Sequence, residues 1–139
     1  MRTEGEILQL IYNIVKVSDL YTYIHSKGGE VFKKQRPKIR AGNNMDIVVA
    51  VLAGTNSKIQ RFTVNVNVYF PDINSGGEFF EDTNQSKQIQ SICADLFEHY
   101  DHNEYFISYS QGAVPKTFAL EDTHEHFVRN ELSITIQNF

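Results

Sequence analysis

The sequence predicts an α+β fold, with an antiparallel-type sheet of four to five strands and two amphipathic helices packed on one of its faces. Apolar residues recur at helical spacing over residues 4–16 and 84–100, and they alternate strictly with polar residues over residues 62–70. Each helix therefore has one apolar stripe and the sheet has one apolar face. These surfaces are buried together when both helices lie on the same side of the sheet.

The first helix is predicted over residues 4–16. Thr3 and Glu6 have the spacing of a capping box, in which the Thr3 hydroxyl accepts a hydrogen bond from the Glu6 amide and the Glu6 carboxylate accepts one from the Thr3 amide. The tyrosine-rich segment 20–24 that follows is either a helical extension or irregular. The apolar stripe behind the cap consists of Ile7, Leu10, Ile11, Ile14 and Val15.

Three strands are expected between the helices. Gly28-Gly29 precedes a short strand at residues 30–33, and the apolar, β-branched run 45–53 is typical of a buried strand. In the alternating strand, one face is apolar and the other polar, so the apolar face is expected to meet both helices. The residues expected on the apolar, helix-facing side are Phe62, Val64, Val66, Val68 and Phe70. Those expected on the opposite, polar side are Thr63, Asn65, Asn67 and Tyr69.

The second helix is predicted over residues 84–100, where the apolar stripe includes Cys93. Residues 105–110 form a strand in this prediction, and the alternation around Leu132, Ile134 and Ile136 indicates a final one. Residues 111–126 are interpreted as a long polar loop.

Length and composition favour one globular domain over residues 1–139. Hydrophobic residues make up 41% of the chain and charged residues 22%, which is ordinary for a folded soluble domain. The single cysteine cannot form an internal disulfide, and no apolar run approaches the roughly 20 residues of a membrane-spanning helix. We therefore expect synthesis in the cytoplasm and no membrane partner. The formal charge of −4 disfavours strong binding to duplex DNA.

The histidines suggest the main catalytic alternative, a small metal-dependent or hydrolytic enzyme. Zinc needs three or four converging ligands, and the candidates are His99, His102, His124 and His126. A hydrated turn and a polar loop explain the same residues without a metal. Cys93 lies on an apolar stripe, where a thiol stays protonated and inert. We expect no catalytic residue, no metal and no cofactor.

Charged residues gather in separate segments of the sequence. A basic cluster without acids contains Lys33, Lys34, Arg36, Lys38 and Arg40. Acidic loops contain Glu78, Glu81 and Asp82 and, further on, Glu121, Asp122 and Glu125. Segregated opposite charges suit a head-to-tail contact between identical subunits, with Tyr21 and Tyr23 as aromatic contributors to the interface. Exposed loops that carry charge for solubility are the alternative interpretation.

The element order resembles that of the tail-terminator and head–tail joining (tail-completion) proteins of long-tailed bacteriophages and prophages. The matching features are the opening amphipathic helix, Gly29-Glu30-Val31-Phe32 with Arg36-Pro37, the strand from Asp46, the alternating strand, the second helix and the last strand. The resemblance covers nearly the whole chain. It implies a non-catalytic structural protein of the virion that forms a ring, typically a hexamer, at the head-proximal end of the tail tube.

Such a ring binds itself, the tail tube protein and the head–tail connector or stopper protein, and DNA passes through it without specific binding. The expected location is the neck of the virion, after synthesis in the host cytoplasm. A monomeric cellular adaptor is the third alternative.

Overall fold

The computed structural model describes residues 1–137. Its elements, in chain order, are α1 (Glu4–Lys16), α2 (Asp19–Ser26), β1 (Val31–Lys33), η1 (Lys38–Arg40), β2 (Asp46–Gly54), β3 (Ile59–Pro71), β4 (Ile73–Ser75), β5 (Glu78–Phe80), α3 (Thr83–Phe97), β6 (Tyr100–Asp101), β7 (Tyr105–Tyr109), β8 (Lys116–Leu120), η2 (Glu121–Thr123) and β9 (Glu125–Gln137). The fold is α+β, as predicted.

The main sheet has more strands than the four to five expected. Seven strands take part, in the order β1-β2-β3-β9-β7-β6, and β8 also pairs with β9; β4 and β5 form a separate two-stranded hairpin. All neighbouring pairs are antiparallel except β1 and β2. The long strands β3 and β9 pair along their whole length, from Ile59 opposite Gln137 to Pro71 opposite Glu125.

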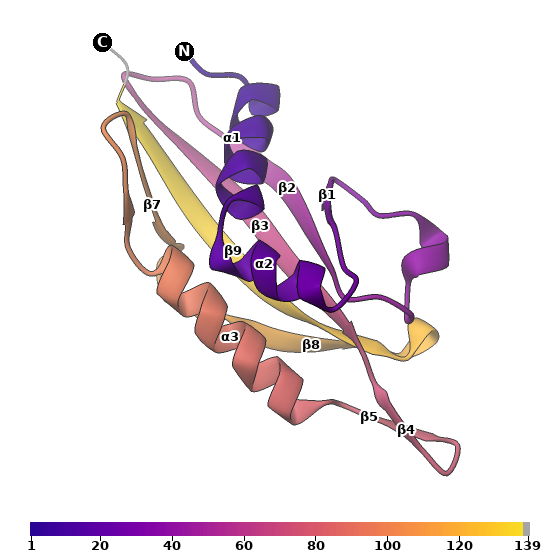
Figure 1. Cartoon of the computed structure of the whole chain (residues 1–139). Helices are drawn as coiled ribbons and strands as arrows, with labels where there is room; N and C mark the ends of the chain where they lie inside the picture. Colours follow the sequence, from indigo (N-terminus) through magenta and orange to yellow (C-terminus); the bar gives the residue numbers. More distant parts are fainter. Residues whose placement is uncertain (138–139) are drawn as a thin grey trace.

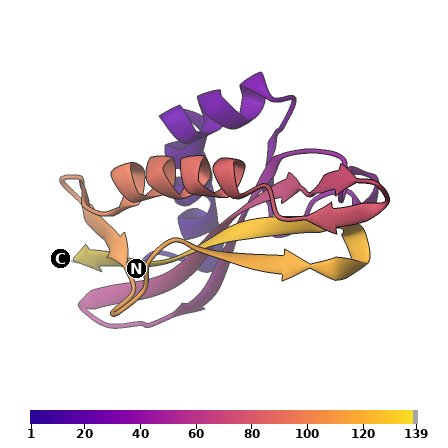
Figure 2. The same ribbon diagram turned by 90° about the horizontal axis from the view of Figure 1, so that it is seen from below.

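Three helices, one more than predicted, lie on one face of the sheet (Figures 1 and 2). The capping box at Thr3 and Glu6 is present, and α1 has the predicted bounds. The tyrosine-rich segment is helical because Ser18 caps it: the Ser18 hydroxyl accepts a hydrogen bond from the Tyr21 amide at 3.3 Å.

The predicted face assignment of the alternating strand is confirmed. Its five apolar side chains are buried at 0–4% exposure, within one core cluster that also includes side chains from all three helices. Thr63, Asn65 and Asn67 are only half-buried and lie on the helix-free face.

Two predictions for the second half of the chain were wrong in detail. The helix predicted over 84–100 ends at Phe97, because Tyr100 and Asp101 pair with β7 instead. The predicted loop 111–126 contains β8 and η2, and β9 already begins at Glu125. β8 lacks strict alternation, and its pairing with β9 rather than its own composition makes it a strand.

Candidate protein interaction site

The basic segment 33–40 begins at the last residue of β1 and continues into the connection to β2, where ion pairs join it to the rest of the molecule. The Arg36 side chain is only 9% exposed and donates a hydrogen bond to Oε1 of Glu125, which is buried. Its guanidinium also lies 3.7 Å from Asp46 and 4.0 Å above the Tyr69 ring. Arg36 therefore links the segment to the start of β9 within one subunit.

Arg40 belongs to the same buried charge cluster. Its Nε and Nη2 donate to the two carboxylate oxygens of Asp46 at 2.9 and 2.7 Å, and the Asp46 side chain is fully buried. These hydrogen bonds raise the pKa of Arg40. Gly42, with φ of +77°, lies against the Thr123 backbone, where an added Cβ would approach the carbonyl oxygen to 2.3 Å. The loop that follows the basic segment is thus in contact with the acidic η2 turn within one molecule.

The three lysines of the segment remain at the surface. Lys33 donates to Gln9 of α1 and lies 4.9 Å from the Tyr12 ring centroid. Lys34 and Lys38 are exposed and make no ion pair within residues 1–137. Only these two of the five basic candidates are both exposed and without a side-chain partner in the described part of the chain.

The acidic candidates fall into three environments. Asp82 caps α3, since its carboxylate accepts a hydrogen bond from the Gln85 amide at 3.1 Å. Glu81 lies 3.6 Å from His126. Glu78, on the β4–β5 hairpin, and Glu121 and Asp122, in η2, are exposed.

Both tyrosine candidates make contacts within the subunit. The Tyr21 hydroxyl lies 2.9 Å from Lys16 Nζ and donates to Glu30 at 3.1 Å. The Tyr23 hydroxyl accepts a hydrogen bond from Gln85, which joins α2 to α3. Neither ring is free to insert into a partner without breaking these contacts.

The clearest exposed apolar feature was not predicted. We call the hairpin formed by β4 and β5, with the residues at its base (72–82), the arm; it projects from one end of the molecule (Figure 1). It exposes Ile73, Phe79 and Phe80 at 49%, 43% and 50%. Two short β-prone segments on either side of Ser75-Gly76-Gly77 were the sequence signal for this hairpin, and the segment was interpreted as a loop.

Histidines hold the arm to the body of the molecule. The His124 ring stacks on Phe79 with a centroid distance of 3.7 Å. His126 Nδ1 lies 2.5 Å from the Asp72 carboxylate. His126 therefore contacts both ends of the arm, Asp72 and Glu81.

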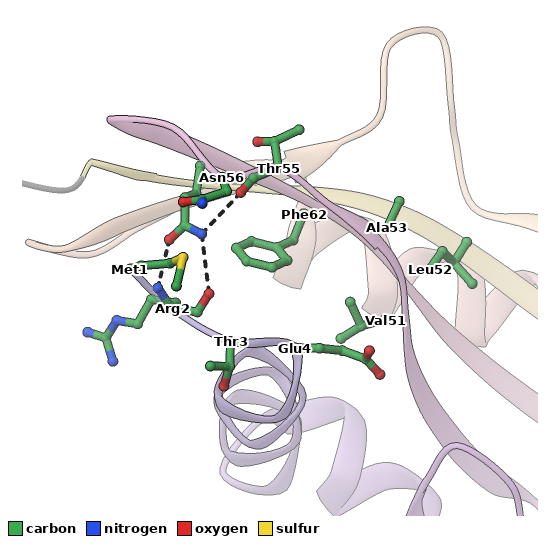
Figure 3. Close-up of a pocket in the computed structure, with 12 residues that line it drawn as sticks. Met1, Arg2, Thr3, Glu4, Val51, Leu52, Ala53, Thr55, Asn56 and Phe62 are labelled. Atoms are coloured by element: carbon green, nitrogen blue, oxygen red, sulfur yellow. Dashed lines mark hydrogen bonds between the residues drawn. The ribbon is translucent and has the colours of Figure 1, made fainter.

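A second feature that sequence reasoning missed lies at the other end of β3. β1 pairs with β2 only at Ile47–Val49, so no described strand pairs with the outer side of residues 50–54. We call residues 50–54 the free edge. A pocket of about 330 Å³ adjoins it, between the N-terminal residues 1–4 and the β2–β3 turn (Figure 3).

The pocket is held open by a few specific contacts. The Gln60 amide accepts from the Arg2 backbone amide at 2.8 Å and donates to the Arg2 and Thr55 carbonyls, which fixes the N-terminal segment beside the turn (Figure 3). The Phe62 ring lies across Gly54, where an added Cβ would approach the ring to 2.5 Å. The lining combines apolar side chains with backbone polar groups, which suits an aromatic side chain on an extended segment.

The four histidines of the metal hypothesis do not converge. His102 and His99 flank β6, near the end of β9 where Tyr105 pairs with Ile136, whereas His126 pairs with Phe70 near its start. Ten residues of strand separate these positions, about 33 Å. Within residues 1–137 there is no group of three or more His, Cys, Asp or Glu side chains that could hold a metal.

Cys93 is fully buried, as predicted, in a small polar network. Asn130 Nδ2 donates to the Val66 carbonyl at 2.9 Å and lies 3.3 Å from the Cys93 sulfur, and the Tyr109 hydroxyl donates to Asn130 Oδ1 at 2.7 Å. Burial raises the pKa of the Cys93 thiol to about 12 and raises the pKa of Tyr109.

These raised pKa values predict a loss of stability at alkaline pH. Above the unfolded-state pKa of about 9, the thiol ionises in the unfolded chain but not in the folded one, so unfolding releases a proton and the free energy of unfolding falls by up to about 1.4 kcal/mol per pH unit for this group. We expect a urea unfolding series between pH 7 and pH 11 to show this decline. In Cys93→Ala the decline should be shallower; an equal slope in both proteins would contradict the assignment.

None of the helices within residues 1–137 is both long and apolar enough to cross a membrane. No protein-family model matches the chain, and no curated protein matches it.

Proposed function

We propose that the chain is a structural protein of a phage virion, which forms a ring at the head-proximal end of the tail tube and joins it to the head connector without catalysis. The arm is the observation that supports this proposal most strongly. Three large apolar side chains are exposed on the eleven residues of the projecting arm, among acidic neighbours. Exposed apolar groups rimmed by polar residues mark protein-binding surfaces.

The resemblance in element order supplies the identity of the partners: further copies of the chain, the tail tube protein and the connector. An overall acidic protein suits a ring through which DNA passes without being held, because a net negative charge disfavours binding to phosphates. Lys34 and Lys38 are available as charged groups at the rim of a subunit contact. An exposed ion pair between one of these lysines and an acidic residue of a neighbouring subunit would supply about 0–1 kcal/mol. Pairs of this kind fix the alignment of the two subunits more than they increase the affinity.

The test is electron microscopy of tail tubes assembled from the tube protein of the same phage or prophage genome. With this protein added, we expect ring-shaped density at one end of each tube. Lys34→Glu with Lys38→Glu should reduce the fraction of capped ends, and added salt should act in the same direction on the wild type.

The control is the thermal unfolding of the double variant, which we expect to be unchanged because both lysines are exposed. Bare tube ends at saturating protein would contradict the proposal. A protein that stays monomeric at high concentration and in the presence of tubes would favour the adaptor function instead.

A further inference from the structure

The free edge of β2 lacks the charged side chains that protect most edge strands. Its five residues, Ala50-Val51-Leu52-Ala53-Gly54, include no charged side chain, and the register with β3 shifts between Val51 and Ala53. Edge strands that avoid pairing usually carry charges; here β1, β6 and β8 contain Lys33, Asp101 and Lys116. Leu52, at the irregularity, is 52% exposed. An uncharged open edge of this length is a template for the addition of a strand.

The pocket beside the free edge provides room for one large side chain. Val51, Leu52, Ala53 and Phe62 are apolar residues of its lining, and residues 1–3 form the opposite side (Figure 3). In β-strand addition, main-chain hydrogen bonds supply affinity, and a pocket for an alternate side chain supplies specificity. Both parts of such a site are present at this end of the molecule.

The arm has the complementary features. It is a two-stranded hairpin whose outer sides pair with no described strand, so it has main-chain groups to offer. Phe79 is stacked on His124, but Phe80 makes no ring contact within residues 1–137 and is half exposed. Neighbouring residues of a strand point to opposite faces, so Phe80 is the aromatic side chain free to enter a pocket.

The stretches of chain that form the free edge with its turn and the arm carry opposite charges, and Glu4 is the acidic residue that also lines the pocket. No Lys or Arg occurs between Arg61 and Lys87, and the arm within this stretch carries Asp72, Glu78, Glu81 and Asp82. No Asp or Glu occurs between Asp46 and Asp72, a stretch that includes the free edge, Lys58 of the β2–β3 turn and Arg61 near the start of β3. Neither Lys58 nor Arg61 forms an ion pair in the described part of the chain.

The arm cannot reach the free edge of its own molecule. The turn before Ile59 and the arm after Pro71 lie at opposite ends of β3, whose 13 residues span about 40 Å. A contact between the two surfaces must therefore join two molecules. Because it uses two different patches, it is heterologous and leads to a ring when the rotation between copies closes.

We propose that the arm of one copy adds β5 to the free edge of β2 in a second copy and places Phe80 in its pocket. This contact rests on the proposed function, for which it supplies the subunit interface of the ring. Glu78 then lies toward the basic β2–β3 turn of the second copy. A truncated or mutated arm is expected to abolish association without unfolding the subunit.

The test uses cysteine variants and a short bismaleimide cross-linker, because the buried native Cys93 does not react. Leu52→Cys and Glu78→Cys chains, which both keep Phe80, should give a covalent dimer when mixed in equal amounts at high concentration; Glu78 is an exposed residue of β5. A single chain with both substitutions should give a ladder of higher species. The matched control replaces Ile39, which is 85% exposed and lies outside both surfaces. No dimer, or the same yield from Ile39→Cys mixed with Glu78→Cys, would overturn the proposed contact.

Sedimentation equilibrium gives an independent measure. Phe80→Ser is expected to weaken self-association by at least about tenfold, as for the loss of an aromatic group at the centre of an interface, while Ile39→Ser leaves it unchanged. Both variants should keep the wild-type unfolding midpoint; unchanged association of Phe80→Ser would overturn the proposal. Rings on tail tubes without the cross-link between positions 52 and 78 would refute this contact but not the proposed function. If the cross-link forms but the tube ends stay bare, the contact is supported and the proposed function is refuted.

Discussion

Replacing Val66 with Asp is expected to destabilise the subunit by about 4 kcal/mol or more. Val66 is fully buried at the centre of β3, directly opposite Val49, and a carboxylate there has no cation to pair with. A charge buried without a partner is among the largest single-residue costs. Urea unfolding followed by circular dichroism measures the loss. Because the Asp variant is at risk of not folding at all, Val66→Ala should also be measured, with an expected cost of about 2 kcal/mol.

The control for this prediction is Asn67→Asp, one position further along the strand and on the helix-free face. Asn67 pairs in register with Arg129, so the new carboxylate faces a cation and the change should cost less than about 1 kcal/mol. Asn65 is a poorer control because it lies opposite Glu131. Equal losses for the substitutions at 66 and 67 would show that the assignment of the two sheet faces is wrong.

Replacing Arg36 with Ala is expected to cost about 3–5 kcal/mol, because it leaves the buried Glu125 carboxylate without its cation. This result would separate Arg36 from the exposed lysines of its segment. Lys34→Ala is the matched control: this side chain is exposed and unpaired in the described residues, so the change should stay within about 0.5 kcal/mol. The comparison needs only thermal or urea unfolding of the two variants.

A double substitution shows whether the loss comes from the unpaired charge. Arg36→Met combined with Glu125→Leu removes both charges and keeps similar volumes, so most of the stability lost in Arg36→Ala should return. If Arg36→Ala is as stable as Lys34→Ala, the charge cluster does not hold the segment. For the same reason, Arg36 is unsuitable for testing subunit contacts by charge reversal, because the subunit itself would be destabilised.

Local sequence patterns were sufficient to predict those helices and strands whose structure depends on their own residues. The capping box and apolar stripe predicted α1 with its observed bounds, and the alternation at residues 62–70 predicted which face of β3 is buried. Both features depend on neighbours within a few residues in the chain, since helical and strand periodicity are local properties. The segment at β8 has no such periodicity and is a strand only because β9 pairs with it. The end of α3 was displaced for the same reason, by the pairing of Tyr100 with β7.

The sequence by itself determined the α+β class, the first helix, the central strand and the inert, buried thiol. Only the tertiary structure decided which charges are free. The basic segment and the acidic segment near residue 125 are far apart in the chain and appeared as two separate surfaces, but folding brings Arg36 onto Glu125 and Gly42 onto Thr123. The structure likewise exposes the arm and leaves residues 50–54 of β2 unpaired. Pairing and exposure depend on contacts between residues distant in the chain, and short-range spacing carries no information about them.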